Sequence, residues 1–381
     1  MPDQNNSKKT LYIQIALFII TFITTTLAGA EWIYGRYFFL NEDGIGWNKW
    51  LTSDKIIESL KFSVPFLLIL TVHEFGHYFT ARYYKIKVTL PYYIPFWFGI
   101  SSSIGTMGAF IQIKEQIKSR KEYFDVGLAG PMAGFLVALL VLFYGFTNLP
   151  PATYIFSIHP EYQQYGLDYA QTVYKGLEGN FYIGKNLIFW LFENYVADPS
   201  RIPNQYEIMH YPFLFAGFLA CFFTALNLMP VGQLDGGHIL YGLVGEKNHR
   251  MISLTLFFIF VFYAGLGTVS AVDFVNNSGI YPFFYFFFLY VLFSRIGKNF
   301  KTTFLLSFGM FTIQLGLTYF FPGIKGYSGW LLFAFILGRF LGVYHPVAED
   351  NKPLDTKRII LGIVSLLIFV LCFTPTPFVV E

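Results

Sequence analysis

Long apolar runs alternate with short polar segments along most of this chain. Runs of about 20 apolar residues are long enough to cross a bilayer as helices. The candidate spans lie near residues 11–29, 58–82, 123–146, 211–229, 251–268, 281–296, 302–321, 328–344 and 358–374. Some of these runs are short, so the pattern predicts an all-α polytopic membrane protein with eight or nine transmembrane helices.

A different pattern occupies residues 88–113, between the second and third runs. This stretch is apolar, but Pro91, Pro95 and three glycines interrupt it and disfavour a continuous helix. Irregular backbone is tolerated at membrane depth only where it is buried in protein or lines a cavity. The segment therefore predicts a re-entrant, β-hairpin-like structure, and an amphipathic hairpin that only anchors the protein at the interface is the alternative.

Composition agrees with a membrane protein. Hydrophobic residues make up 55% of the 381 residues and charged residues 13%, whereas soluble domains have about 25% charged residues. The net charge of +3 is too small to indicate a nucleic-acid partner. Cys221 and Cys372 both lie inside apolar runs, which favours neither a disulfide framework nor a thiolate zinc site.

Basic residues predict the orientation of the spans. Lys8 and Lys9 precede the first run, and Arg82, Lys85 and Lys87 follow the second. By the positive-inside rule, the N-terminus is cytoplasmic, and in a bacterium the membrane would be the cytoplasmic (inner) membrane. The first run lacks a convincing cleavage site, so we interpret it as an uncleaved anchor.

The polar insert at residues 147–210 is predicted to lie on the external side. It contains six acidic and three basic side chains, and this acidic balance agrees with the orientation deduced from the basic loops. Its function is open at this stage, since it could cap a site, screen substrates or only connect two spans.

The second apolar run contains the motif His73-Glu74-Phe75-Gly76-His77. His73 and His77 are four residues apart, so on a helix their imidazoles project from one face and can bind one zinc ion. Glu74 lies beside them, where it can take a proton from the attacking water. The alternative is a pair of buried core histidines with Glu74 as their counter-ion.

A third zinc ligand is predicted after the fourth run. The predicted topology places Asp235 on the cytoplasmic side, at about the depth of His77. Two histidines and one aspartate leave zinc one position for water. Asn227 can donate a hydrogen bond to the scissile carbonyl as charge develops there. A helix-terminal carboxylate at Asp235 and a helix-packing amide at Asn227 are the alternatives.

Two further segments are predicted to surround this site. Small residues at helical spacing in 127–134 predict that the third run packs closely against the helix of the second run, which carries His73 and His77 and is called the zinc helix. Extended strands commonly hold peptides for cleavage. We therefore predict a substrate-binding edge strand formed by Gly105, Thr106, Met107, Gly108, Ala109 and Phe110.

Taken together, these motifs resemble those of the site-2 protease family of intramembrane zinc metalloproteases. The motifs are HEFGH at 73–77, GTMGAF at 105–110, GLAGPMAG at 127–134 and N-x-x-P-x-x-x-x-D-G-G at 227–237. The resemblance implies one Zn²⁺ per chain bound by His73, His77 and Asp235. It also implies Glu74 as general base, Asn227 as auxiliary polar residue, and a membrane-spanning or membrane-anchored protein as substrate.

No stretch outside the predicted spans is long enough for a typical PDZ module, so the chain looks more like the branch without PDZ domains that includes plastid homologues. The resemblance divides the chain into an N-terminal anchor and loop (1–57), a catalytic membrane core (58–245) and C-terminal transmembrane helices (246–381). Two alternative functions remain, a membrane transporter and a non-catalytic membrane chaperone that contains zinc. The absence of an internal inverted repeat argues against the first, and the presence of Glu74 argues against the second.

Overall fold

The structure is a computed structural model that describes residues 2–41, 44–176, 179–276 and 280–380. Helices dominate it, and the three sheets found among these residues have two strands each. The chain forms two compact units. Unit 1 contains Met1–Ile117, Leu128–Leu226 and Leu367–Glu381, and unit 2 contains Lys118–Gly127 and Asn227–Leu366.

Unit 1 holds the first membrane helices and the polar insert. Its helices are α1 (Pro2–Tyr34), α2 (Ser53–Glu58), α3 (Leu60–Tyr83), most of α4 (Arg120–Thr147), α5 (Ile155–Ile158), α6 (Ala170–Val173), α7 (Leu187–Tyr195) and most of α8 (Pro212–Leu228). Its strands are β1 (Leu40–Asn41), β2 (Gly44–Ile45), β3 (Tyr92–Phe96), β4 (Gly105–Phe110), β5 (Phe181–Ile183) and β6 (Phe378–Val380). Short 3₁₀ turns complete the insert: η1 (Ala152–Tyr154), η2 (Pro160–Asp168), η3 (Pro199–Arg201) and η4 (Gln205–His210).

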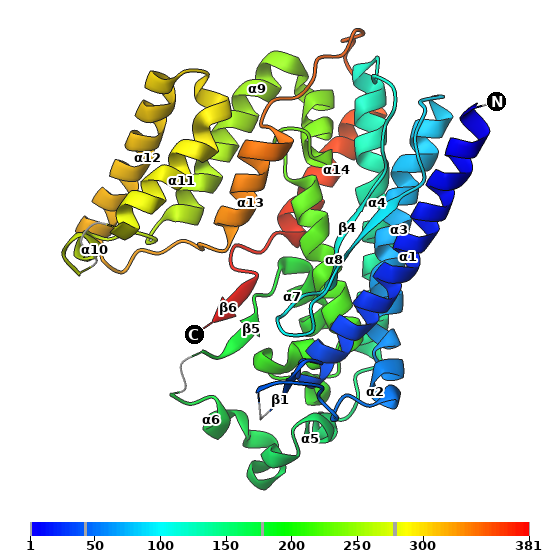
Figure 1. Ribbon diagram of the computed structural model, residues 1–381, viewed down its shortest axis with the longest axis vertical. Coiled ribbons are helices and arrows are strands. Elements are labelled where there is room, and N and C mark those ends of the chain that lie inside the picture. The colour runs from blue at the N-terminus through cyan, green and yellow to red at the C-terminus, as the bar shows by residue number, and fades with distance from the viewer. Residues whose placement is uncertain (1, 42–43, 177–178, 277–279, 381) are drawn as a thin grey trace. The chain divides into compact units, whose positions relative to one another are not determined.

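Unit 2 is built mainly from Asn227–Leu366. Its elements are α9 (Asp235–Gly265), α10 (Ala271–Asn276), α11 (Ile280–Gly297), α12 (Phe300–Phe320), α13 (Trp330–Ile336), the π-helical turn η5 (Leu337–Leu341) and most of α14 (Thr356–Cys372). Helices α11 and α12 are consecutive in the chain, lie side by side in Figure 1 and contact each other.

Among the described residues, five helices are long and apolar enough to cross a membrane. They are Lys8–Tyr34, Ser53–Tyr83, Arg120–Thr147, Ile280–Gly297 and Phe300–Phe320. Two shorter apolar helices, Pro212–Leu228 and Trp330–Leu341, occur as well. A multi-pass membrane protein is therefore confirmed, and the count of eight or nine spans stays a prediction.

Strands β3 and β4 pair antiparallel, with an irregular register between Tyr93 and Pro95. The pair runs beside α1 and α3 (Figure 1). Side chains of α1 fasten it, because Gln14 Nε2 donates to the Leu90 carbonyl at 2.7 Å and Thr24 Oγ1 donates to the Gly105 carbonyl at 2.7 Å. Residues 88–113 thus contain a pair of antiparallel strands that α1 holds in place. Whether this pair enters the membrane as a re-entrant segment stays a prediction.

Gly105 is required where β4 meets α1. Its φ is +81°, and a Cβ there would lie 2.2 Å from Thr25 Cα, which is backbone and cannot move aside easily. We expect Gly105→Ala to destabilise the protein by about 1–3 kcal/mol more than Gly108→Ala, through overpacking. Gly108 is the matched control, because its φ is +107° and a Cβ there meets nothing within 4 Å. Thermal unfolding in detergent measures the difference, and equal midpoints for the two variants would contradict the close approach.

Candidate functional site

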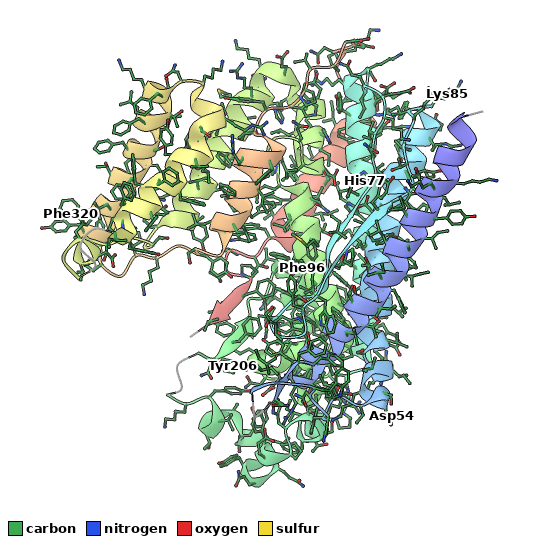
Figure 2. All side chains as sticks on the ribbon, viewed as in Figure 1. Asp54, His77, Lys85, Phe96, Tyr206 and Phe320 are labelled. Carbon is green, nitrogen blue, oxygen red and sulfur yellow. The ribbon has the colours of Figure 1, made fainter. Side chains whose placement is uncertain are left out.

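Helix α3 carries three polar side chains in its C-terminal half. His73, Glu74 and His77 are 7%, 5% and 7% exposed, and Figure 2 shows His77 in the half of α3 that leads toward Lys85. Burial of three ionisable groups in an apolar helix is costly unless they have polar or metal partners. In the structure, His73 and His77 lie next to each other on one face of α3, as the spacing predicts.

The two imidazoles are positioned to bind one ion. His73 Nε2 and His77 Nε2 lie 3.1 Å apart. Two ligands at about 2.05 Å from a tetrahedral zinc ion lie about 3.3 Å apart, so this spacing is within a few tenths of an ångström of the zinc geometry. A direct hydrogen bond between the imidazoles has a similar length, so the spacing fits the ion without requiring it.

Glycines of α4 make room for these histidines. A Cβ on Gly130 would lie 2.1 Å from His77 Nε2, and one on Gly134 would lie 3.0 Å from His73 Cβ. On the other side of the contact, a Cβ on Gly76 would lie 2.6 Å from the Ala129 carbonyl oxygen. The prediction that small residues in 127–134 pack against the zinc helix is therefore confirmed within unit 1.

The β3–β4 pair is joined to the same helix. Thr71 Oγ1, two residues before His73, lies 2.8 Å from the Tyr93 hydroxyl of β3. Thr106 Oγ1 donates to the Ile94 carbonyl at 2.8 Å and accepts from the Gly108 amide at 3.0 Å. Thr106 is thus engaged in holding the strand pair together.

The six predicted substrate-binding residues differ in accessibility. Gly105 and Thr106 are buried, Gly108 and Ala109 are half-buried, and Met107 and Phe110 are 59% and 48% exposed. The part of β4 that can touch another chain is therefore residues 107–110.

Asn227 and Asp235 belong to unit 2. Asn227 is the penultimate residue of α8, and Asp235 is the first residue of α9. The first turn of α9 needs glycine where it packs on the preceding turn, since a Cβ on Gly236 would lie 2.0 Å from the Leu228 carbonyl oxygen and one on Gly237 would lie 2.3 Å from the Gly232 carbonyl oxygen. The two glycines thus allow the backbone that presents Asp235.

The first turn of α9 also contains His238, which forms a histidine pair that the sequence did not indicate. His238 Nδ1 is 2.7 Å from His345 Nε2, and the ring of His345 stacks on Tyr241 at 4.0 Å. Burial and the neighbouring His238 lower the pKa of His345 to about 2, so His345 stays neutral. The residues of the pair are 107 positions apart, and no local spacing could have revealed it.

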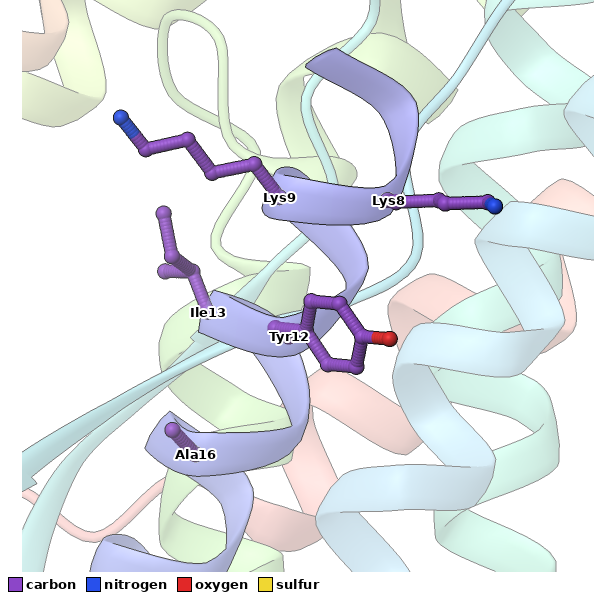
Figure 3. A pocket seen from close by; sticks show the side chains of 5 residues that line it. All are labelled: Lys8, Lys9, Tyr12, Ile13 and Ala16. Atoms are coloured by element: carbon purple, nitrogen blue, oxygen red, sulfur yellow. The ribbon is translucent and has the colours of Figure 1, made fainter. Parts of the chain in front are cut away.

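A surface hollow on α1 is unrelated to these residues. Figure 3 shows that it is lined by Lys8, Lys9, Tyr12, Ile13 and Ala16, which all come from one helix. It contains no histidine or carboxylate, and we assign it no chemistry.

Comparison with known proteins identifies the family of the chain. The sequence pattern of Peptidase family M50 matches residues 61–272, which include HEFGH and Asp235. The chain therefore belongs to this family, that of the site-2 proteases. Membership in a peptidase family does not favour the transporter or chaperone alternative.

Similar curated proteins are named as chloroplastic zinc metalloproteases. The probable zinc metalloprotease EGY1 of Oryza sativa subsp. japonica is 29% identical over 54% of this chain and 31% of its own length. EGY1 of Arabidopsis thaliana is 29% identical over 50% of this chain and 30% of its own. EGY2 of Arabidopsis thaliana is 23% identical over 84% and 43%. The chain thus spans less than half the length of these relatives, and no solved structure matches it.

Proposed function

We propose that this protein is a zinc-dependent intramembrane endopeptidase that hydrolyses peptide bonds in or near the transmembrane segments of other membrane proteins. The observation that supports this most directly is the buried His73–His77 pair on α3, which fits closely against the glycines of α4. Cleavage of reporter transmembrane segments by the purified protein tests the proposal.

The proposed ligands of one catalytic Zn²⁺ are His73, His77 and Asp235. The inclusion of Asp235 is supported by its place in the N-x-x-P-x-x-x-x-D-G-G motif at 227–237 and by the family match that covers this motif. When bound, the ion supplies Lewis acidity toward the scissile carbonyl and the attacking water.

The chain's own side chains supply the proton transfers. Glu74 is buried beside the two histidines, and it would remove a proton from the attacking water and return it to the leaving amine. Asn227 would donate a hydrogen bond to the carbonyl oxygen of the substrate as negative charge develops there. These roles follow the positions of the two residues in the motifs of the family.

A substrate helix has to unwind before its peptide bond can be attacked, since in lipid its backbone is fully hydrogen-bonded. The edge of β4 offers replacement hydrogen bonds to an unwound segment. We propose that residues 107–110 bind the substrate, while Gly105 and Thr106 hold the strand in place. Exposed Met107 and Phe110 would contact the side chains of the substrate.

The orientation follows from the basic residues. Lys8 and Lys9 before the first span, and Arg82 and Lys85 at the end of the second, favour a cytoplasmic N-terminus. His77 lies less than two turns from Arg82, so the proposed zinc site lies toward the cytoplasmic side.

We expect Asp235→Ala to lower the zinc affinity of the catalytic site by more than about 100-fold, because removal of a direct ligand should exceed the 10–100-fold typical of outer partners. Metal analysis of the purified protein after exchange against a weak chelator measures the loss. Asp54→Ala is the control, since Asp54 is exposed in the first turn of α2. If Asp235→Ala kept as much zinc as this control, Asp235 would not be a ligand.

A further inference from the structure

A second cluster of ligating side chains lies in the polar insert of unit 1, away from the HEFGH motif. His159, Glu207 and His210 place one ligand atom each within 4.8 Å of one another. His210 Nε2 is 3.4 Å from His159 Nε2 and 3.3 Å from Glu207 Oε2. Glu207 is 0% and His210 5% exposed, whereas the side chain of His159 is 23% exposed.

The outer nitrogen of each histidine has its own partner. His210 Nδ1 lies 2.7 Å from the Ile33 carbonyl oxygen, which can only accept, so Nδ1 carries the proton. With its proton on Nδ1, the neutral imidazole of His210 presents a lone pair at Nε2. His159 Nδ1 lies 3.0 Å from Glu161 Oε1 and donates to that carboxylate, which leaves the lone pair of His159 on Nε2.

The carboxylate has one satisfied and one unsatisfied oxygen. Glu207 Oε1 accepts from the Tyr174 hydroxyl at 2.5 Å. Glu207 Oε2 is buried and has no hydrogen-bond partner among the described residues. The Tyr169 hydroxyl also lies near this carboxylate. An unsatisfied buried carboxylate oxygen is costly, and here it faces two imidazole lone pairs.

Three electron-pair donors that converge on one point repel one another unless a metal ion or a proton lies between them. We propose that His159, Glu207 and His210 form a second metal site, which binds a divalent transition-metal ion of the Zn²⁺ class. The spacings of 3.3 and 3.4 Å equal the edge of about 3.3 Å expected between ligands of a tetrahedral zinc ion. Two imidazoles and one carboxylate suit zinc, whereas calcium and magnesium prefer all-oxygen sites.

The neighbours of the cluster match the outer shell of known metal sites. Metal-binding histidines usually donate their other N–H to a backbone carbonyl or a carboxylate, as His210 does to Ile33 and His159 does to Glu161. The main alternative is a shared proton, with a protonated His159 donating to His210. In that alternative neither imidazole offers a proton to Glu207 Oε2, whereas a metal ion would bind all three side chains.

The position of the site suggests a structural function. His159 follows α5, His210 precedes α8, and Ile33 is in the last turn of α1. A metal ion bound there would link His159 to His210, which are 51 residues apart in the chain. Through the contact of His210 with Ile33, it would also link the insert to the first helix. We infer that the ion fastens the insert to unit 1, independently of the peptidase activity.

The test counts zinc in full-length protein whose HEFGH histidines are both replaced, His73→Ala with His77→Ala. This parent should bind one Zn²⁺ per chain, and Co²⁺ in its place should give the visible absorption of a tetrahedral site. Adding His159→Phe should weaken zinc binding by more than about 100-fold. Phenylalanine keeps a ring where His159 stacks on Tyr162 at 4.5 Å, so the loss would report the missing nitrogen.

Two further variants separate ligation from packing. Tyr162→Phe alters the stacking partner of His159 and removes no proposed ligand, so it should leave zinc binding unchanged. Glu161→Gln removes the carboxylate behind His159 and should weaken binding about 10–100-fold. A parent that binds no zinc, or one whose zinc survives His159→Phe, would overturn the second site. Because the parent lacks the HEFGH histidines, either result is independent of whether the proposed peptidase function is correct.

Discussion

Glu74→Gln should abolish peptide cleavage while the protein keeps its catalytic zinc. Glutamine has nearly the shape of glutamate, but it cannot accept the proton of the attacking water. General acid–base catalysis contributes about 10²–10⁴-fold, so the rate should fall by at least that factor. The measurement is cleavage of a panel of reporter transmembrane segments in detergent, with bound zinc counted on the same preparations.

Glu115→Gln is a matched control for this substitution. Glu115 pairs with Lys87 at 2.7 Å, and its side chain is 41% exposed. Exposed ion pairs contribute little to stability, so this variant should cleave at the wild-type rate. Normal turnover by Glu74→Gln would rule out Glu74 as the base, whereas loss of zinc together with activity would indicate a structural role for this side chain.

The central part of the site could be predicted from sequence because its signals are local. His73 and His77 are four residues apart on one helix, and Gly127, Gly130 and Gly134 recur at helical spacing, so their faces follow from helix geometry alone. The structure adds the contact between Gly130 and His77. That contact is between two different helices. Sequence periodicity shows which residues share a helix face, but it does not show which helix packs against that face.

The insert shows where sequence reasoning ends. His159 and His210 belong to no motif, and 51 residues with several short irregular turns separate them. No periodicity relates such positions. The pairing of β5 (Phe181–Ile183) with β6 (Phe378–Val380) is a similar case, since it joins the middle of the chain to its last described residues.

Helix boundaries deviated where glycine sets the backbone. The run near 251–268 is part of the longer α9, which is interrupted at Gly245 with a φ of +77°. The run near 328–344 forms α13 and a π-helical turn that stops at Gly342, where φ is +87°. Glycine is compatible with helix, turn and left-handed backbone alike, so composition could not fix these boundaries.

Gly130→Ala should produce a folded protein that has lost its catalytic zinc. The added Cβ would lie 2.1–2.5 Å from three ring atoms of His77. These atoms are the far end of a side chain that can rotate, so the ring should leave the site while the helices stay packed. We expect zinc affinity to fall by at least tenfold and cleavage to fall with it.

Gly309→Ala in α12 is the control, because a Cβ at Gly309 meets nothing within 4 Å. Alanine is favoured over glycine in a helix by about 1 kcal/mol, so this variant should unfold at the wild-type temperature or above and retain its zinc. Thermal unfolding and metal analysis of both variants separate lost ligation from lost packing. Full zinc content in Gly130→Ala would mean that α4 can move away from α3, and that the close approach of Gly130 does not position His77.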